Sequence, residues 1–238
     1  GTKTCAGYPS SFDHEFIDAQ TFADFGIDFL KYDFCYKPAY VNGPLLYHRM
    51  GMALKATGRE ILFSACNWGS DEVGKWIRST GAHMYRSTGD INDSFNSFKD
   101  IAKSQLPLLG YSAPGCYNDI DMLIVGMGGK GNVAFGGCTD EEYFMHFALW
   151  CMMASPLMIG CDIRNMSEAT VKTLTNKNLI ALNQDEEARP CFPVSGNMGD
   201  SLTLFRHLSN NEYCLGVFNF TDGDASQNVE FYDIGLSA

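Results

Sequence analysis

The chain has 238 residues, of which 45% are hydrophobic and 19% charged, a balance typical of a folded globular protein rather than a disordered one. Its 28 acidic and 17 basic side chains give a net charge of −11, which argues against nucleic acid or an anionic membrane surface as a partner, because both need a basic face. A neutral ligand such as a sugar is compatible with an acidic surface. No apolar run approaches the roughly 20 residues of a membrane span.

In chain order, the sequence alternates between short apolar runs rich in β-forming residues and longer segments of helical period. The expected elements are a helix over 15–25, a strand over 27–32, a helix over 44–56, a strand over 60–65, a helix over 71–79, a strand over 83–86, a helix over 94–103, a strand over 109–112, a helix over 141–153, a strand over 157–159 and a helix over 168–175. A loop dominated by glycine is expected over 126–137.

The strands are apolar on both faces, so each is expected to be covered on both sides, as in a parallel sheet with helices outside it. The fold class is therefore α/β, and a doubly wound sheet and a (β/α)8 barrel both fit. No glycine-rich phosphate fingerprint follows any of the strands, which weakens the dinucleotide-binding version of the doubly wound sheet.

After about residue 190 the pattern changes. Residues 201–207 and 213–220 are strand-like, a polar Ser-Asn-Asn-Glu turn separates them, and no helical period returns. We therefore predict two domains, residues 1–189 and residues 190–238, the second being the beginning of an antiparallel β domain. This second part is too short to be a stable domain alone.

The cysteines bear on the compartment. Nine is a high number for a cytosolic protein, and because it is odd at least one cysteine cannot pair within the chain. No two cysteines have the C-x-x-C spacing of a zinc or redox site. Three glycosylation sequons, at Asn92, Asn165 and Asn219, are short enough to occur by chance and add little weight. We expect a secreted or lysosome-like compartment.

Polar side chains follow the expected strands at their carboxyl ends, where the active sites of parallel barrels lie. Asp33 ends the first strand, and Lys31 precedes it on the same face. The residues that follow the later strands are Asn67 and Trp68, Arg86 and Asp90, Asn118, Asp119 and Asp121, and Asp162 and Arg164.

These side chains combine carboxylates, cations and an aromatic ring, which suits glycoside hydrolysis. In that reaction one carboxylate attacks the sugar or activates water, and the other protonates the leaving oxygen. Lys31 and Arg86 can keep a neighbouring carboxylate ionised and donate hydrogen bonds to sugar hydroxyls, and Trp68 can offer an apolar face to a pyranose ring. Each residue also has a structural explanation: a strand-end aspartate often caps a helix, as we expect for Asp71 and Asp93, and an arginine near an aspartate is more often a structural ion pair.

Six segments resemble a single family in their order and spacing. They are KTCAGYP at 3–9, DAQTFAD at 18–24, LKYDFCY at 30–36, NDIDML at 118–123, ASPL at 154–157 and NQD at 183–185. The resemblance is to glycoside hydrolase family 27, which holds the α-galactosidases and α-N-acetylgalactosaminidases, and it covers nearly the whole chain.

The resemblance implies a (β/α)8 barrel, here from about its fourth to its eighth strand. It also implies a retaining α-galactosidase, which removes terminal α-linked galactose from oligosaccharides or glycoconjugates by double displacement. Asp33 matches the nucleophile of the family and Asp90 its acid/base. Around them the resemblance implies Lys31, Arg86, Asn67 and Trp68 as substrate-binding residues, Asp119 and Asp121 as supports of the site, and Cys5 and Cys35 as a disulfide beside the nucleophile. No metal or other cofactor is implied.

The chain departs from the family pattern at two positions. Asn67 stands where the α-galactosidases usually have a glutamate before the Trp, and an amide donates as well as accepts hydrogen bonds. The same mechanism acting on α-N-acetylgalactosamine or β-L-arabinopyranose is therefore an alternative. Cys66 pairs in some relatives with a cysteine at the position of Ala82, so we expect a free thiol here.

The family's first three strands, with a Trp and a pair of Asp that hold the outer hydroxyls of the sugar, have no counterpart in this sequence. A barrel without them exposes two sheet edges. We therefore expect a fragment of a larger polypeptide whose partners are a carbohydrate substrate and either the missing part of the barrel or a second copy in a homo-oligomer. An inactive sugar-binding fragment is the remaining alternative.

Overall fold

The computed structural model describes residues 1–237. These residues form two compact units. The first unit consists of Gly1–Gly89 with Gly115–Asp119, and the second of Asp90–Pro114 with the described residues from Ile120 onward. Within the described chain, no helix is both long and apolar enough to cross a membrane.

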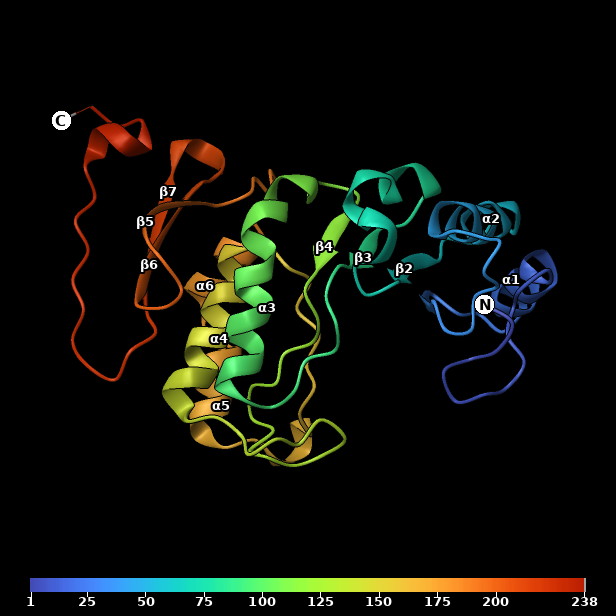
Figure 1. Cartoon of the computed structure of the whole chain (residues 1–238), viewed down its shortest axis with the longest axis horizontal. Helices are drawn as coiled ribbons and strands as arrows, with labels where there is room; N and C mark the ends of the chain where they lie inside the picture. Colours follow the sequence, from blue (N-terminus) through green and yellow to red (C-terminus); the bar gives the residue numbers. More distant parts are fainter. Residues whose placement is uncertain (238) are drawn as a thin grey trace. The chain divides into compact units, whose positions relative to one another are not determined.

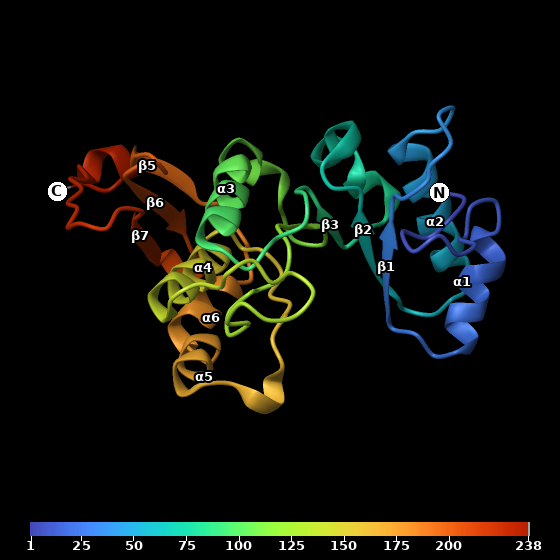
Figure 2. The same ribbon diagram turned by 60° about the horizontal axis from the view of Figure 1, so that its bottom comes forward.

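The first unit is built on a parallel sheet of four strands in the order β1-β2-β3-β4 (Figure 1). The strands are β1 (Phe29–Asp33), β2 (Leu62–Cys66), β3 (Met84–Arg86) and β4 (Tyr117–Asp119). The helices are α1 (Glu15–Asp24), α2 (Gly43–Ala56) and the short 3-10 helices η1 (Ser70–Lys75) and η2 (Ile77–Thr80). Helices α1 and α2 lie side by side next to β1 (Figure 2).

Helix α2 shows how the sequence builds this unit. Asn42 caps its first turn, because the Asn42 side chain accepts a hydrogen bond from the amide of Leu45 at 3.0 Å. Asp71 accepts another from the amide of Gly43 at 2.8 Å, so this expected helix cap serves α2. The buried residues recur every three to four positions and comprise Leu46, Tyr47, Met50, Ala53 and Leu54. Gly51 lets α2 approach η2 closely, since a Cβ there would lie 1.9 Å from the carbonyl oxygen of Thr80.

Strand β1 is covered on one face only. Leu30 and Tyr32 pack on the core that α2 helps to form, whereas Phe29, Lys31 and Asp33 on the opposite face are exposed. The expectation that each strand is covered on both sides is therefore wrong for β1. The exposed face is the one that carries two of the predicted site residues.

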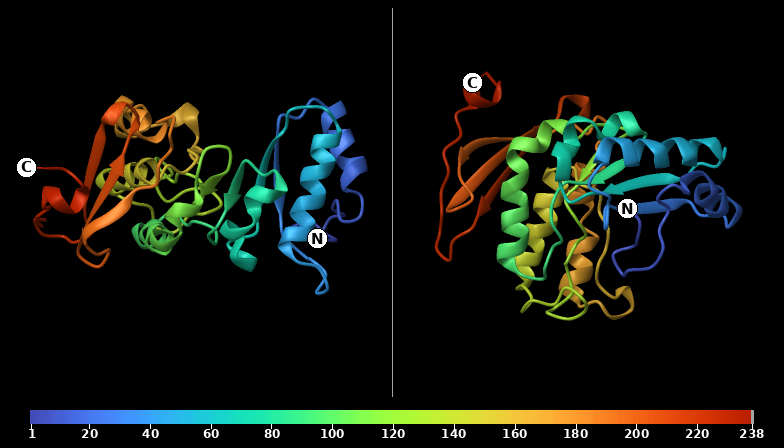
Figure 3. Two further views of the ribbon diagram at one scale, coloured as in Figure 1. Left: turned by 90° about the horizontal axis from the view of Figure 1, so that it is seen from above. Right: turned by 45° about the vertical axis from the view of Figure 1, so that its right-hand side comes forward.

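The second unit packs helices against an antiparallel sheet in the order β5-β6-β7. Its elements are α3 (Phe95–Gln105), η3 (Leu106–Tyr111), α4 (Asp140–Met152), η4 (Ile163–Asn165), α5 (Glu168–Leu174), α6 (Lys177–Asn183), β5 (Phe192–Gly196), β6 (Ser201–His207), η5 (Ser209–Asn211), β7 (Tyr213–Asn219) and η6 (Phe231–Ile234). Helices α3 and α4, green and yellow in Figure 3, run side by side.

A single hydrophobic core joins the helices of the second unit to its sheet. Helix α4 begins at a capping box formed by Thr139 and Glu142. It buries Trp150, which belongs to the same core as Leu204 of β6 and Phe218 of β7. The strands after residue 190 thus share their core with α4, and the predicted domain division at residue 190 stays a prediction.

Two expected elements are wrong in type. The segment expected as a strand over 109–112 is part of the helix η3, and the strand of this region is β4. Pro107, two residues before the expected strand, suits the first turn of this helix. The helix expected over 71–79 is replaced by η1 and η2, because Asp71 and Glu72 adopt φ of 56° and 53°.

Three smaller differences concern short elements. The strand expected over 157–159 is reduced to an isolated parallel bridge between Leu123 and Ile159. The sequence did not predict α6, which has seven residues, or β5, which contains both proline and glycine, because neither shows a clear period. The α/β class itself is confirmed, with a parallel sheet followed by an antiparallel one.

Candidate active site

The strand ends of the first unit align predicted site residues in one row. The parallel register pairs Asp33 with Cys66, Cys66 with Arg86, and Arg86 with Asp119. Because register partners in a parallel sheet point to the same face, these four side chains share one face at the carboxyl ends of the strands. Lys31 lies two residues earlier in β1 and therefore also on that face. The sheet thus brings two carboxylates and two cations together.

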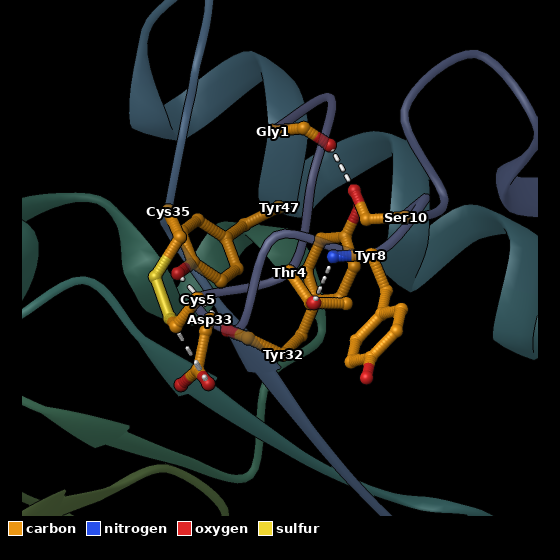
Figure 4. The surroundings of a disulfide bond; sticks show 9 residues. All are labelled: Gly1, Thr4, Cys5, Tyr8, Ser10, Tyr32, Asp33, Cys35 and Tyr47. Carbon is orange, nitrogen blue, oxygen red and sulfur yellow. Dashed lines mark hydrogen bonds between the residues drawn. A yellow bond between two sulfur atoms is a disulfide. The ribbon is translucent and has the colours of Figure 1, made fainter.

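The predicted disulfide between Cys5 and Cys35 is confirmed, and it lies beside Asp33 (Figure 4). The Sγ atom of Cys5 is 3.8 Å from Oδ2 of Asp33. The segment that carries Cys5 is held at the end of β1 by the amide of Thr2, which donates to the carbonyl of Tyr36 at 3.1 Å. The disulfide walls one side of the Asp33 carboxylate and gives it no hydrogen bond, since a disulfide sulfur carries no hydrogen.

Aromatic side chains hold the end of β1 from its covered face. The hydroxyl of Tyr47, a residue of α2, donates to the carbonyl oxygen of Tyr32 at 3.1 Å (Figure 4). The Tyr47 ring also stacks on Phe34 with the two centroids 5.7 Å apart. Burial raises the pKa of Tyr47 well above its ordinary value, so it remains a donor. The backbone on both sides of Asp33 is therefore fixed.

Cys66 lies between the charged residues of the row. It is a buried free thiol, as the sequence predicted. Burial raises the pKa of Cys66 to about 12, while the positive charges of Lys31 and Arg86 oppose the rise and Asp33 adds to it. Lys31, Arg86 and Asp33 therefore all influence the pKa of the Cys66 thiol. The thiol stays protonated and unreactive at neutral pH.

The loop after β2 holds Asn67 and Trp68 in place. The Nδ2 atom of Asn67 donates to the carbonyl of Ser70 at 2.7 Å. Its Oδ1 atom is buried and has no hydrogen-bond partner in the part of the chain that the structure describes. Trp68 adopts a left-handed φ of 55° and packs, half-buried, on the core of the first unit. A left-handed backbone conformation in a residue as bulky as tryptophan persists only where the surrounding structure packs against it. The contact of Asn67 and Trp68 with substrate stays a prediction.

Arg86 shapes the backbone that leads to Asp90. Its side chain is buried, and its Nη2 atom donates to the carbonyls of Thr88 at 3.2 Å and Gly89 at 2.9 Å. Asp90, the next residue along the chain, is exposed. The guanidinium therefore fixes the turn before the predicted acid/base as well as lying in the row of strand ends.

Asp121 holds the residue that follows Asp90. Its Oδ2 atom accepts a hydrogen bond from the amide of Ile91 at 2.7 Å, and its Oδ1 atom accepts one from the amide of Met122 at 2.7 Å. The carbonyl of Asp121 accepts the indole N–H of Trp150 at 2.7 Å. A side chain from one irregular segment thus fixes the backbone of another, immediately beside Asp90.

The sequence did not predict a polar centre formed by Asp93 and Tyr143. Asp93 is fully buried; its Oδ1 atom accepts the hydroxyl of Tyr143 at 2.8 Å, and its Oδ2 atom accepts the amide of Gly129 at 2.7 Å. The Tyr143 hydroxyl accepts the amides of Gly128 at 2.8 Å and Cys138 at 3.3 Å. The expectation that Asp93 caps a helix is wrong, because Ser94 caps α3. The six glycines of residues 126–137 were the available clue, since such a loop needs acceptors from outside itself.

The predicted site residues therefore form two groups. The first unit carries the disulfide and the six residues Lys31, Asp33, Asn67, Trp68, Arg86 and Asp119, and the second carries Asp90 and Asp121. Among residues 1–237, no group of three His, Cys, Asp or Glu side chains is arranged to hold a metal ion.

Comparison with known proteins identifies the family. The model of the Melibiase_2 family, described as alpha galactosidase A, matches residues 1–185. The alpha-galactosidase of Cyamopsis tetragonoloba is 38% identical over 237 residues, which are 99% of this chain and 55% of that protein. The chain thus spans about half the length of the curated relatives it matches.

Solved structures of alpha-galactosidases are similar to this chain in fold. Alpha-galactosidase I from Mortierella vinacea has 33% identity and a TM-score of 0.90, over 98% of this chain and 62% of that chain. The alpha-galactosidase from Saccharomyces cerevisiae with raffinose has 30% identity and a TM-score of 0.82, over 92% of this chain and 54% of that chain. With its parallel sheet, its strand-end row and its disulfide, the chain belongs to the Melibiase_2 family of alpha-galactosidases, in glycoside hydrolase family 27.

Proposed function

We propose that this chain carries both reacting carboxylates of a retaining α-galactosidase that removes terminal α-linked galactose from oligosaccharides or glycoconjugates. The observation that carries the proposal is the row Asp33, Cys66, Arg86 and Asp119 at the strand ends, with the disulfide against Asp33. Family membership and relatives named as alpha-galactosidases support it. The relative with raffinose supports a carbohydrate as the substrate.

The mechanism follows from two carboxylates with different tasks. Asp33 attacks C1 of the galactose, the bond from C1 to the leaving oxygen breaks, and Asp90 gives its proton to that oxygen. In the second step Asp90 takes a proton from water as the water attacks C1, and the bond to Asp33 breaks. Two inversions retain the α configuration. The cations Lys31 and Arg86 donate hydrogen bonds to the sugar hydroxyls.

The remaining residues of the site have supporting tasks. Asp119 lies in the strand-end row beside Arg86, and Asp121 orients the backbone next to Asp90 through the amide of Ile91. Asn67 and Trp68 contribute to the wall that selects the sugar.

A change of sugar is the second candidate, and Asn67 favours it. The amide stands where family α-galactosidases usually carry a carboxylate, and its Nδ2 atom is already engaged with Ser70. A sugar with an acetamido group at C2, or a β-L-arabinopyranoside, would meet a different contact there than galactose does. The third candidate, an inactive sugar-binding fragment, predicts binding without turnover.

We also infer that β1 to β4 are the fourth to seventh strands of a (β/α)8 barrel. The bridge between Leu123 and Ile159 then marks the eighth strand. Strands β5 to β7 begin a C-terminal β domain after about residue 189. The exposed face of β1 and the 62% coverage of the Mortierella vinacea structure support this inference. The partner of the exposed face is then the rest of the barrel or a second copy, and the compartment is secreted or lysosome-like. Sequencing the coding region upstream of Gly1 tests it, with three further strand–helix units expected.

The test of function uses the full-length gene product and nitrophenyl glycosides of the three candidate sugars. We expect the α-galactoside to be hydrolysed fastest, and Asp33→Ala to lower the rate by several orders of magnitude. Added azide then separates the two roles. Asp33→Ala should yield the β-glycosyl azide, because azide replaces the nucleophile in a single inversion, whereas Asp90→Ala should yield the α-glycosyl azide.

Asp100→Ala, at an exposed position of α3, is the matched control and should retain the wild-type rate. Near-normal turnover by Asp33→Ala would reject it as the nucleophile. Faster turnover of another glycoside would favour the change of sugar, and sugar binding without any turnover would favour the inactive fragment.

A further inference from the structure

The glycine-rich loop 126–137 carries one aromatic side chain, Phe135, which is 71% exposed. The loop, yellow-green in Figure 1, lies near the N-terminal ends of α3 and α4. Gly136 beside Phe135 has φ of 95° and open space at its Cβ position. A single exposed phenylalanine is common on protein surfaces. Whether Phe135 can bind a ligand depends on whether the loop holds its ring in a defined position.

The loop has a fixed shape. A Cβ on Gly137 would lie 2.8 Å from the amide nitrogen of Gly129, so the two arms of the loop touch at its base. The buried carboxylate of Asp93 accepts the amide of Gly129, and the Tyr143 hydroxyl accepts the amide of Gly128. Burying a carboxylate is unfavourable unless its oxygens are hydrogen-bonded. A loop organised around such a group presents Phe135 in a defined place.

The loop is also tied to the segment that begins at Asp90. Asp93 forms a parallel bridge with Ala134, its amide donates to the carbonyl of Val133 at 2.9 Å, and its carbonyl accepts the amide of Gly137 at 2.9 Å. Phe135 follows Ala134 directly, and Asp90 precedes Asp93 by three residues. The three residues from Asp90 to Asp93 span at most about 10 Å, which is about the length of a disaccharide, and the bridge from Asp93 to Ala134 adds about 5 Å. The ring therefore lies within reach of the leaving-group sugar, whose oxygen Asp90 protonates in the proposed mechanism.

We propose that Phe135 is a specificity-determining residue, which supports the sugar next to the one that is cleaved off. This inference rests on the proposed function, in which Asp90 protonates the leaving oxygen and the leaving group therefore departs on its side. The C–H face of a pyranose is apolar, and an exposed aromatic ring on a fixed loop offers a flat apolar surface to it. Small glycine neighbours leave room for the sugar. The ligand is thus the leaving-group sugar of an α-galactosyl oligosaccharide.

Two substrates of the full-length enzyme test this role. One is an α-galactosyl disaccharide, whose leaving group is a sugar, and the other is α-galactosyl fluoride, whose leaving group is a single atom that cannot reach Phe135. We expect Phe135→Ala to lower kcat/KM for the disaccharide about tenfold, the size of a lost apolar contact in a binding pocket. For the fluoride the change should stay below about twofold, because no sugar is lost from the ring. Phe135→Tyr should retain the wild-type ratio of the two values.

Tyr232→Ala, which removes another exposed aromatic side chain of the second unit, is the control and should leave both values unchanged. Equal losses on both substrates, or no loss on either, would overturn the role of Phe135 while leaving the proposed function intact. Failure of the wild-type enzyme to hydrolyse either substrate would overturn the proposed function and this inference with it. A thermal melt of each variant checks the fold, and Phe135→Ala should melt within about 1 °C of wild type because the ring is solvent-exposed.

Discussion

The two carboxylates of the proposed mechanism are held by different kinds of structure. Asp33 ends a regular strand, and the β1–β2 ladder, the Tyr47 hydroxyl and the disulfide fix its surroundings. Asp90 begins a segment without helix or strand. The carboxylate of Asp121 accepts the amide of Ile91 in this segment, and the buried carboxylate of Asp93 ties the segment to Gly129 of the glycine-rich loop. The first arrangement distributes its support over many backbone bonds, whereas the second depends on a few side chains. Single substitutions should therefore damage the second region more selectively.

The largest expected effect on stability comes from the disulfide. Replacing Cys5 and Cys35 together by serine releases a link across 30 residues, which should lower the free energy of unfolding by about 3 to 4 kcal/mol. Activity should fall less than about tenfold, because the ladder to β2 still fixes Asp33. Urea unfolding of the full-length protein measures the first quantity, and an initial-rate assay measures the second.

Reductant provides the control for the disulfide. It should destabilise the wild-type protein by a similar amount and leave the double variant unchanged. Identical unfolding midpoints for wild type and variant would mean that the disulfide does not stabilise the protein beyond what the β1–β2 ladder provides. The disulfide would then not contribute to the support of Asp33.

Asp121→Ala tests the irregular region directly. It removes the acceptor for the amide of Ile91, so Asp90 should be displaced, and a displacement of about 1 Å can cost about 100-fold in rate. The loss should be large for a disaccharide, which needs a proton on its leaving oxygen. It should be small in kcat/KM for a dinitrophenyl glycoside, because dinitrophenolate leaves without protonation and kcat/KM does not include the later water step in which Asp90 acts as base. A merely structural role of Asp121 would lower both rates equally, and Asp100→Ala serves again as the neutral control.

The same contrast explains what the sequence could predict. The strands β1, β2 and β3, and the residues Asp33 and Arg86 at their ends, follow from apolar runs and from the rule that active sites lie at the carboxyl ends of parallel strands. The role of Asp93 does not follow, because a local reading of Asp93-Ser94 before a helix indicates a cap. Its actual partners, Gly129 and Tyr143, are 36 and 50 residues away. Local patterns carry no information about such contacts.

A buried histidine makes the irregular region sensitive to pH. The Nε2 atom of His146 accepts the amide of Ile124 at 3.1 Å, just before the glycine-rich loop, and burial lowers the pKa of His146 from 6.5 to about 3. Between these two values only the unfolded state binds the proton. Stability should therefore fall as the pH drops from about 6.5 to about 3, by at most about 1.4 kcal/mol per pH unit from this group.

His146→Gln keeps an acceptor but cannot titrate, so its free energy of unfolding should depend less on pH between 4 and 6. His48→Gln, at an exposed position of α2, should keep the wild-type slope. Urea unfolding at several pH values gives both slopes, and equal slopes in all three proteins would show that acid acts elsewhere.

The smallest effect, from Tyr143→Phe, separates side-chain from backbone support of the glycine-rich loop. The substitution removes a hydroxyl that donates to Asp93 and accepts the amides of Gly128 and Cys138, and it leaves the ring in place. The free energy of unfolding should fall by about 1 to 2 kcal/mol, since two amides and a carboxylate lose a partner. The ratio of disaccharide to fluoride turnover should fall in the same direction as in Phe135→Ala but by less, because the Gly129 amide still binds Asp93. Tyr213→Phe, at an exposed position of β7, should change neither quantity. A destabilised Tyr143→Phe with an unchanged turnover ratio would mean that the backbone bonds of Asp93 alone fix the position of Phe135. Backbone hydrogen bonds would then hold the loop, as the β1–β2 ladder holds Asp33.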